Sequence, residues 1–277
     1  DHMQFLGSTI PQIAMEKAGI IKPRTVVVSS RQKPEALAVI RRKAREEKAR
    51  LFVLGREFSA RRTASAATWQ EISVSSSGYR IDGVRTPLLG RHQVDNVAVA
   101  VHAARNLSSL GFPLTDEAIR LGVSQTVWPA RLQKLSSEPP VLLDGAHNPA
   151  GVRTLLRALD ELPLRPRHFL VSILKDKDWK KMVRLILPRA EAIVFTRADS
   201  ERALDPEVLA SYARRVAPAV SIAGIPEVGD ALRASLASGK PLVICGSLYL
   251  AADVLKVWRR LRLCSGGVSR GRGRTVP

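Results

Sequence analysis

Residues 141–148 read Val-Leu-Leu-Asp-Gly-Ala-His-Asn, and Pro149 follows them. The apolar run is typical of a buried strand, and Asn148 before Pro149 is typical of a helix start. Asp144 and His147 therefore lie where a strand ends and a helix begins, and the helix dipole and free N–H groups favour an anion there. A capping turn without a binding role is the alternative, but such a turn needs neither Asp144 nor His147.

The same alternation of strand and helix continues to residue 262. Strands are predicted at 141–144, 169–174, 192–196, 220–223 and 242–245, and helices near 150–161, 178–187, 205–216, 228–238 and 248–262. Short connections between alternating elements predict an open parallel sheet with helices on both faces. Such Rossmann-like α/β sheets bind ligands at the carboxyl ends of their strands. We expect this domain to cover residues 139–262, with its boundary at Pro139-Pro140.

Two further predicted strands end in polar turns. Residues 243–247 (VICGS) place Ser247 at a helix start, and residues 174–178 (LKDKD) place three charged residues and Asp178 before the next helix. Backbone N–H groups at such turns can hold an anion. An ordinary helix cap explains both stretches as well or better, so both interpretations stay open.

Residues 1–138 show a less regular pattern. Thr9, Pro11 and Gln12 predict a capping box that starts a helix, and Gly19 is expected to end it. The other predicted elements are strands at 25–30, 50–54 and 131–135, helices at 34–49, 92–107 and 115–121, and an antiparallel hairpin at 68–81. Parallel strands need neighbours on both sides, and few are available here. We therefore expect the chain to be the C-terminal part of a longer protein.

Composition excludes several classes of protein. The 277 residues are 45% hydrophobic, enough for a buried core, and no apolar run reaches the roughly 18 residues of a membrane span. Two cysteines, Cys245 and Cys264, form no disulfide framework and fit a reducing cytoplasm. The first residues also lack the layout of a signal peptide.

The charge is strongly positive, with 44 Lys and Arg against 25 Asp and Glu, a formal net charge of +19. The excess is divided evenly, +9 over residues 1–139 and +10 over residues 140–277. Only 5% of the residues are aromatic, so surfaces that stack single-stranded bases are scarce. A solvated Arg-rich surface is favoured over a nucleic-acid interface. The Arg- and Gly-rich residues 263–277 are expected to form a disordered basic tail that can touch an anionic surface.

Six motifs occur in order along the chain. They are DH-x3-LG-x-TI-x2-IA-x-EKAGIIKP at 1–23, GRHQ-x2-N at 90–96, WPARLQ at 128–133, LLDGAHNP at 142–149, DKD at 176–178 and CGSLYL at 245–250. In this combination the chain resembles the bifunctional folylpolyglutamate synthase / dihydrofolate synthase family, among the Mur-ligase-like enzymes. The resemblance runs to about residue 262. It implies that residues 1–138 are part of a P-loop-type central ATPase domain and that residues 139–262 are a glutamate ligase domain.

The resemblance implies an ATP-dependent ligase that uses Mg²⁺. A carboxylate of folate or dihydropteroate attacks the γ-phosphate of ATP and gives an acyl phosphate and ADP. The amine of L-glutamate then attacks the acyl carbon and phosphate leaves. The implied enzyme is cytoplasmic, binds small molecules without a membrane or nucleic acid, and is a monomer when full length.

The family's functional residues carry over to matching positions in the first part of the chain. His2 matches a histidine that ligates magnesium, although an isolated terminal histidine is usually solvated. Lys17 matches a carbamylated lysine, and carbamylation needs the neutral form of an amine whose free pKa is about 10.4. Without the resemblance, a lysine at a helix end would simply complement the helix dipole. Asn96 and Arg131 match contacts to ATP.

Three more residues match in the second part. Asp144 matches a catalytic residue on the nucleotide side that also counts among the ATP contacts. His147 matches a second catalytic position, and it and Ser247 match positions near the incoming glutamate.

The chain also departs from the family. A phosphate-binding loop and two further metal ligands precede the DH motif in the family and do not occur in this sequence, so we expect the chain to be inactive alone. Ala130 stands where the family usually has glycine. Three alternatives remain: another Mur-type amino-acid ligase with a different acceptor, a non-catalytic remnant that binds a partner or an anion, and a nucleic-acid binder acting through the tail.

Overall fold

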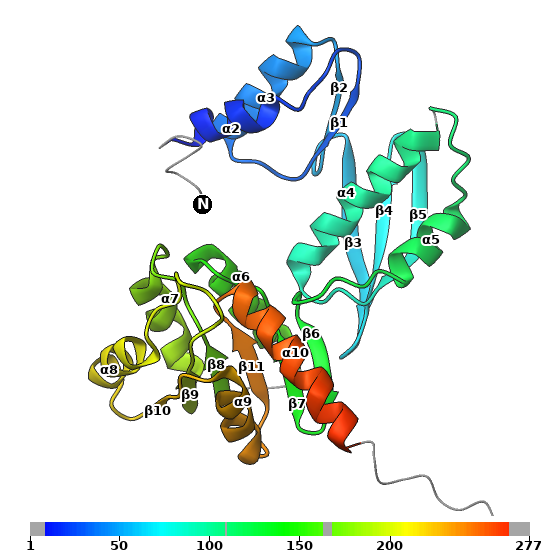
Figure 1. Cartoon of the computed structure of the whole chain (residues 1–277). Helices are drawn as coiled ribbons and strands as arrows, with labels where there is room; N and C mark the ends of the chain where they lie inside the picture. Colours follow the sequence, from blue (N-terminus) through cyan, green and yellow to red (C-terminus); the bar gives the residue numbers. More distant parts are fainter. Residues whose placement is uncertain (1–8, 109, 163–167, 266–277) are drawn as a thin grey trace, which may run out of the picture. The chain divides into compact units, whose positions relative to one another are not determined.

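The computed structural model describes residues 9–108, 110–162 and 168–265, with the side chains of 262–265 left aside (Figure 1). The chain forms two compact units, unit 1 up to Trp128 and unit 2 from Pro129 onward. Within the described ranges, no helix combines the length and apolarity needed to span a bilayer.

Unit 2 contains a six-stranded sheet. In chain order the strands are β6 (Gln133–Ser137), β7 (Pro140–Leu143), β8 (His168–Val171), β9 (Ala192–Phe195), β10 (Ser221–Gly224) and β11 (Leu242–Cys245). Their order across the sheet is β10-β9-β8-β11-β7-β6, and only β6 runs antiparallel to its neighbour. The predicted Rossmann-like parallel sheet is therefore confirmed, and β6 is an added antiparallel edge.

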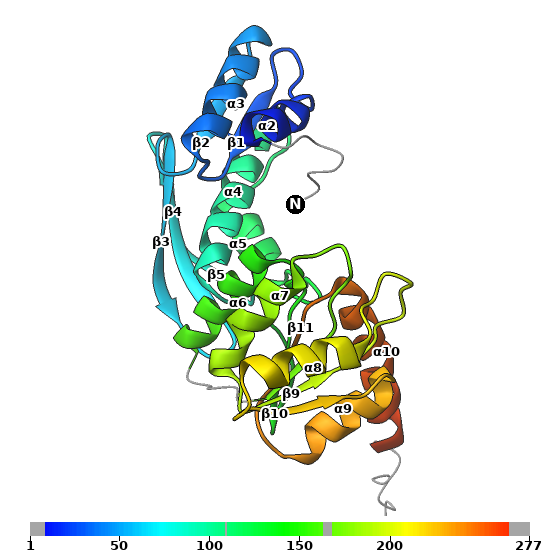
Figure 2. The same ribbon diagram turned by 90° about the vertical axis from the view of Figure 1, so that its left-hand side faces the viewer.

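Helices cover this sheet on both faces, as predicted. They are α6 (Pro149–Glu161), α7 (Trp179–Ile186), α8 (Pro206–Val216), α9 (Val228–Ala237) and α10 (Leu248–Ser265), with a short 3-10 helix at Leu187–Arg189. Helix α7 packs between α6 and α8, whereas α9 packs on α10 (Figure 2). Leu170 and Ile244 of the sheet form one buried cluster with Leu232 of α9 and with Leu250 and Val254 of α10. Burial of such apolar surface on both faces is what stabilises a parallel sheet.

Unit 1 begins with a parallel strand pair and two helices: α2 (Ile10–Ala18), β1 (Val26–Ser29), α3 (Pro34–Glu46) and β2 (Arg50–Val53). Strands β1 and β2 pair in parallel with Val26 opposite Arg50. The predicted capping box at the start of α2 is confirmed, because Thr9 Oγ1 accepts a hydrogen bond from the Gln12 N–H and the Gln12 side chain accepts one from the Thr9 N–H. Gly19 ends the helix with φ −58, so a left-handed residue is not required there.

The rest of unit 1 is an antiparallel sheet packed on helices. The elements are β3 (Phe58–Ser65), β4 (Gln70–Ser76), β5 (Tyr79–Thr86), α4 (Arg91–Ser108) and α5 (Asp116–Ser124). Ile72 and Val84 of the sheet pack in one cluster with Val97 and Val101 of α4. The predicted hairpin is thus confirmed as β4–β5, and β3 is a third strand that was not predicted.

The two units divide earlier than the boundary that we expected at Pro139-Pro140. The strand predicted near residues 131–135 was assigned to the first domain, but β6 forms antiparallel pairs with β7, with Gln133 opposite Leu143. This pairing makes the segment from Pro129 to residue 138 part of the second unit. A hairpin partner contributes few apolar residues of its own, so the sequence pattern alone did not show which sheet it joins.

Candidate functional site

The candidate site in unit 2 is the edge where β7, β8 and β11 end. The backbone joins these ends: the Asp144 N–H donates to Ile244 O at 2.9 Å, and the Gly246 N–H donates to Ala146 O at 2.8 Å. The Ser172 N–H donates to Cys245 O at 3.4 Å. Segments far apart in the sequence therefore meet at the carboxyl edge of the sheet, where α/β domains bind ligands.

Asp144 shapes this edge through both carboxylate oxygens. Its side chain is only 8% exposed, and Oδ2 accepts a hydrogen bond from the Leu132 N–H at 2.9 Å while Oδ1 accepts one from the Ala146 N–H at 2.8 Å. Two charge-assisted bonds to backbone hold the carboxylate in one orientation. Asp144 therefore fixes the backbone of two segments. The sequence alone assigned Asp144 to catalysis and ATP contact and did not predict this structural role.

The Cys245 thiol behind Asp144 is not a nucleophile. It is 1% exposed, and burial, together with the negative charge of Asp144, raises the pKa of this thiol far above its ordinary value. A buried neutral thiol behaves as a small apolar side chain.

Arg131 stands in a strained turn that Asp144 holds. Ala130 and Leu132, on either side of it, have positive φ values of 56 and 45 degrees. The Gly145 N–H donates to Ala130 O at 2.7 Å, in addition to the bond between Leu132 and Asp144. Left-handed backbone at residues other than glycine is costly and persists where neighbouring contacts impose it, often at functional sites. The turn leaves the Arg131 side chain exposed to solvent.

His147 and Asn148 play different parts at the start of α6. Asn148 is the N-cap, because its Oδ1 accepts a hydrogen bond from the Gly151 N–H at 2.7 Å. His147 is half-buried, and its Nδ1 lies 2.9 Å from Gly145 O. A carbonyl accepts only, so the hydrogen lies on Nδ1, and Nε2 of a neutral ring is the nitrogen that can take a proton. The capping interpretation is confirmed for Asn148 and does not account for His147.

Ser247 is buried at the start of α10. It is 1% exposed, and its Oγ accepts a hydrogen bond from the Tyr249 N–H at 3.0 Å. Gly246 before it has φ +111, and an added Cβ would lie 2.5 Å from Ser172 O. Only glycine fits there, and its backbone fixes the position of the Ser247 hydroxyl, which still has a hydrogen to donate.

The turn after β8 contains a helix cap. Asp178 Oδ1 accepts a hydrogen bond from the Lys181 N–H at 3.3 Å at the start of α7. The capping interpretation of this stretch is confirmed for Asp178. Asp176 and Lys177 have other contacts, described below.

Two of the predicted site residues lie in unit 1. Lys17, in the last turn of α2, is exposed at a cavity of about 790 Å³ that α2, β1, α3 and α4 line mostly with apolar side chains. Asn96 is exposed on α4, and its Nδ2 donates to Gln93 Oε1 at 2.9 Å. The predicted metal ligand His2 lies outside the described residues. In the part of the chain that the structure describes, no three or more His, Cys, Asp or Glu side chains group as metal ligands.

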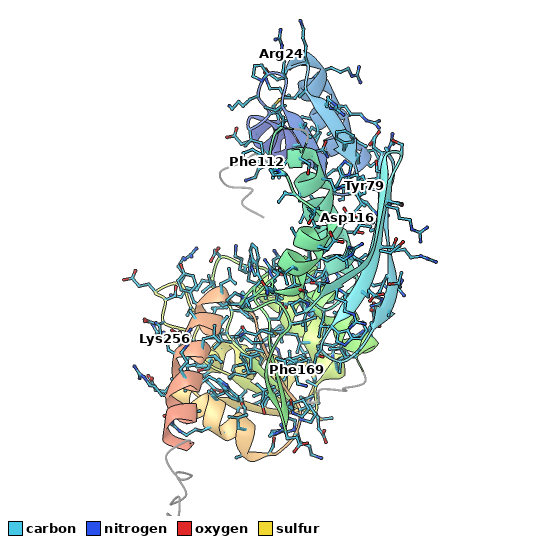
Figure 3. The ribbon with its side chains drawn as sticks, turned by 90° about the vertical axis from the view of Figure 1, so that its right-hand side faces the viewer. Arg24, Tyr79, Phe112, Asp116, Phe169 and Lys256 are labelled. Carbon is cyan, nitrogen blue, oxygen red and sulfur yellow. The ribbon has the colours of Figure 1, made fainter. Side chains whose placement is uncertain are left out.

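Unit 1 also contains a buried histidine that the sequence analysis did not single out. His102 of α4 is 2% exposed and stacks on Phe58 with ring centroids 4.1 Å apart, and its Nδ1 is 2.8 Å from the Tyr79 hydroxyl. Burial lowers the pKa of His102 and raises the pKa of Tyr79 to about 12. Figure 3 shows Tyr79 on β5 and Asp116 at the start of α5, and Arg105 lies 5.1 Å from the ring of Tyr79 and 3.0 Å from Asp116. His102, Phe58 and Tyr79 therefore form a buried aromatic cluster beside the ion pair of Arg105 and Asp116.

Comparison with known proteins matches both units. Residues 130–248 match the family described as Mur ligase, glutamate ligase domain. The chain is 35% identical over 260 residues to the folylpolyglutamate synthase of Lacticaseibacillus casei, covering 92% of this chain and 59% of that protein. It is 33% identical to the dihydrofolate synthase/folylpolyglutamate synthase of Bacillus subtilis, covering 92% of this chain and 60% of that protein.

Solved structures agree. The Mycobacterium tuberculosis folylpolyglutamate synthase complexed with ADP and AMPPCP superimposes with a TM-score of 0.83 at 28% identity, over 99% of this chain and 62% of that chain. The apo form of the L. casei enzyme gives a TM-score of 0.78 at 31% identity, over 95% of this chain and 59% of that chain. The chain therefore spans about three-fifths of the length of the relatives that it matches.

Proposed function

We propose that this chain, which over the length it spans belongs to the folylpolyglutamate synthase / dihydrofolate synthase family, takes part in the ATP-dependent ligation of L-glutamate to folate or dihydropteroate. The observation that carries the proposal is that four of the predicted site residues lie at one edge of the sheet in unit 2. Arg131, Asp144, His147 and Ser247 all lie at this edge, and hydrogen bonds of the backbone and of the Asp144 and Ser247 side chains link the segments that carry them. Residues 130–248, which contain them, match a glutamate ligase domain.

In the proposed reaction, a carboxylate oxygen of the acceptor attacks the γ-phosphorus of ATP and ADP leaves. The amine nitrogen of glutamate then attacks the acyl carbon, and the bond to phosphate breaks. Both steps move negative charge onto phosphate oxygens, which cationic groups can stabilise. The exposed guanidinium of Arg131 suits this task, because its planar fork matches phosphate geometry.

His147 and Ser247 are assigned to the glutamate side. The attacking amine must lose a proton, and Nε2 of His147 is a nitrogen that can accept it. The Ser247 hydroxyl can donate to a carboxylate oxygen of the amino acid, because its backbone position is fixed by Gly246. Holding the amine in place is itself a large part of the rate enhancement in such reactions.

Asp144 acts as a positioning residue in this proposal. Both of its oxygens already accept backbone hydrogen bonds, and through Leu132 and Ala146 they set the position of Arg131 and of the turn before His147. This refines the assignment of Asp144 to catalysis and ATP contact.

Unit 1 is assigned to the nucleotide. Asn96 is an exposed amide that can contact ATP, and Lys17 is exposed and open to carbamylation, in which its amine takes up carbon dioxide and loses a proton. A carbamate supplies the oxygen ligands that Mg²⁺ prefers. When bound, Mg²⁺ supplies charge for the phosphates. The described side chains build no complete set of ligands for it, so no step is assigned to the ion.

The remaining features of the proposal concern partners and location. The substrates are folate or dihydropteroate, L-glutamate and ATP, and the protein is a cytoplasmic monomer without membrane or nucleic-acid partners. A different Mur-type acceptor and a non-catalytic binding role are the alternatives that the experiment below separates.

A chimera tests the proposal. This chain replaces the matching part of the L. casei synthase, and ADP release is measured with ATP, L-glutamate and either folate or dihydropteroate. We expect release that needs both glutamate and a folate-type acceptor, and His147→Gln should lower kcat by about 100-fold or more. A folded chimera that binds ATP yet shows no glutamate-dependent turnover would overturn the proposal. Turnover only with another acceptor would favour a different Mur-type ligase.

A further inference from the structure

Beside the candidate site, three loops of unit 2 meet at residues that no role above uses. They follow β8, β9 and β11. The Lys175 N–H donates to Arg202 O at 2.8 Å, and a β-bridge joins Leu174 to Ala203, so the first two loops are held together by backbone. The Asp199 N–H donates to Asp253 of α10 at 2.8 Å and ties the second loop to the helix after β11.

Arg202 projects from this junction with its guanidinium held from two sides. Its Nη2 donates to the Tyr249 hydroxyl at 3.2 Å, and its Nη1 lies 3.8 Å from Asp176 Oδ2. The guanidinium carbon is 5.7 Å from the centre of the Tyr249 ring. Despite these contacts the side chain is 55% exposed, so its fork is oriented and still open to solvent. An arginine held in this way loses less entropy when it binds a carboxylate.

Asp176 faces two cations. Its Oδ2 lies 3.3 Å from Lys177 Nζ and 3.8 Å from Arg202 Nη1. Burial alone would raise the pKa of Asp176, but hydrogen bonds from its own backbone and from Lys177, with the charge of Arg202, hold that pKa below its usual value. The carboxylate is therefore ionised at neutral pH, and Asp176, Lys177 and Arg202 together keep one unit of positive charge.

This cluster adjoins the residues assigned to glutamate. Tyr249, which accepts the hydrogen bond from Arg202, is two residues beyond Ser247, and its N–H is bonded to Ser247 Oγ. L-Glutamate reacts through its amine and keeps two free carboxylates that need partners. A bidentate guanidinium is the strongest side-chain partner for a carboxylate, and truncating such a pair is costly.

We propose that Arg202, oriented by Tyr249 and Asp176, binds one carboxylate of the incoming L-glutamate and selects a dicarboxylic amino acid. The proposal rests on the proposed function and goes beyond it, because it names the side chain that recognises the amino-acid substrate. The opposing interpretation is a surface ion pair that only stabilises the loops.

The experiment compares Arg202→Gln with a matched control. Arg189→Gln removes the same charge from another Arg–Asp pair, because Arg189 Nη2 lies 3.0 Å from Asp160 near the C-terminal ends of α6 and α7, away from the carboxyl edge. Steady-state kinetics of the active chimera give KM for L-glutamate, KM for ATP and kcat. Amide chemical shifts of the 277-residue chain during titration with L-glutamate and with L-glutamine give a readout that does not depend on turnover.

For Arg202→Gln we expect KM for L-glutamate to rise about tenfold or more, with KM for ATP and the melting temperature unchanged. Arg202→Lys should restore part of the loss, and Tyr249→Phe should raise the same KM by a smaller factor. In the full chain, L-glutamate should shift amides of the loops at 172–178, 200–203 and 246–249, and L-glutamine should shift them less.

Several results would overturn the proposal while leaving the proposed function intact. They are an unchanged KM for L-glutamate in the active Arg202→Gln chimera, equal effects of Arg202→Gln and Arg189→Gln, or a KM for ATP that rises as much as that for glutamate. Absence of glutamate-induced shifts in these loops would also count against it. A folded wild-type chimera that binds ATP but shows no glutamate-dependent turnover would, by contrast, refute the proposed function itself.

Discussion

The carboxyl edge of unit 2 and the cavity beside Lys17 in unit 1 show two ways of presenting functional side chains. At the edge of unit 2, strands with neighbours and helices on both faces end in turns whose backbone groups are bonded to one another. At the cavity of unit 1, β1 pairs only with β2 among the described residues, and apolar side chains such as Ile20, which is 82% exposed, remain in contact with solvent. At the edge of unit 2, the bonded backbone fixes where each side chain lies. At the cavity of unit 1, fewer contacts fix the side chains, so their positions can adjust.

The sharpest test of this comparison uses two glycines with positive φ. Gly246 in unit 2 has φ +111 and a Ser172 carbonyl oxygen 2.5 Å from an added Cβ, whereas Gly83 in unit 1 has φ +69 and open space around it. We expect Gly246→Ala to lower the free energy of unfolding by about 4 kcal/mol, from strain and overpacking together. Gly83→Ala should cost about 1 kcal/mol, from backbone strain alone.

Chemical denaturation of both variants measures these values. Equal costs at the two positions would show that the edge of unit 2 relaxes as easily as the open position of Gly83 in β5 of unit 1. That result would contradict the conclusion that neighbouring backbone imposes the conformation of the edge of unit 2.

Asp144 gives a second test, with a smaller expected effect. Asp144→Ala leaves the N–H groups of Leu132 and Ala146 without their acceptors, which should cost about 3 kcal/mol. Asp144→Asn keeps one acceptor oxygen and should cost about half of that. Hydrogen exchange should show faster exchange at these two amides, with the core amides of unit 1 unchanged. Slow exchange at both amides in Asp144→Ala would mean that the carboxylate is not what holds the turn.

The third test concerns His102, for which we expect the smallest change in stability. It is also the only one of these tests that depends on pH. Its pKa is lowered in the folded state by burial, so the unfolded chain binds the proton more readily. The stability of unit 1 should be complete above the ordinary histidine pKa of about 6.5 and should fall as the pH drops below it, by at most about 1.4 kcal/mol per pH unit.

The measurement is a series of unfolding curves between pH 5 and 8 that follow unit 1. The control is His102→Phe, which keeps an aromatic ring against Phe58 and has no proton to gain. Its stability should change less with pH than that of the wild type. Identical pH profiles for the two proteins would assign the dependence to other groups.

Much of unit 2 could be predicted from sequence because its signals are local. Most of its strands are short apolar runs, helices α6, α7 and α8 begin at a side-chain cap, and alternation of the two elements predicts a parallel sheet. The capping roles of Thr9 and Asn148 follow from residue type and position alone and are confirmed.

Other features depend on partners distant in sequence. Strand β3 has the sequence FSARRTAS and a single fully buried residue, Phe58, so its pairing with β4 rather than an apolar pattern defines it. The hydrogen bond from Leu132 to Asp144 needs left-handed backbone at residues that usually avoid it. The contact between Arg202 and Tyr249 joins residues 47 positions apart. Composition and periodicity carry no information about such contacts.

The backbone bonds at the carboxyl edge have a consequence for evolution and for protein engineering. The Gly145 N–H donates a hydrogen bond to the Ala130 carbonyl, and the Gly246 N–H donates one to the Ala146 carbonyl. These hydrogen bonds use main-chain atoms and no side chain. Apart from Asp144, whose carboxylate binds two backbone N–H groups, side chains at this edge can therefore be exchanged without moving the backbone that carries them. Under the proposed function, a library that varies Lys177, Arg202 and Tyr249 while retaining both glycines would test whether the chimera can be changed to accept an amino acid other than glutamate.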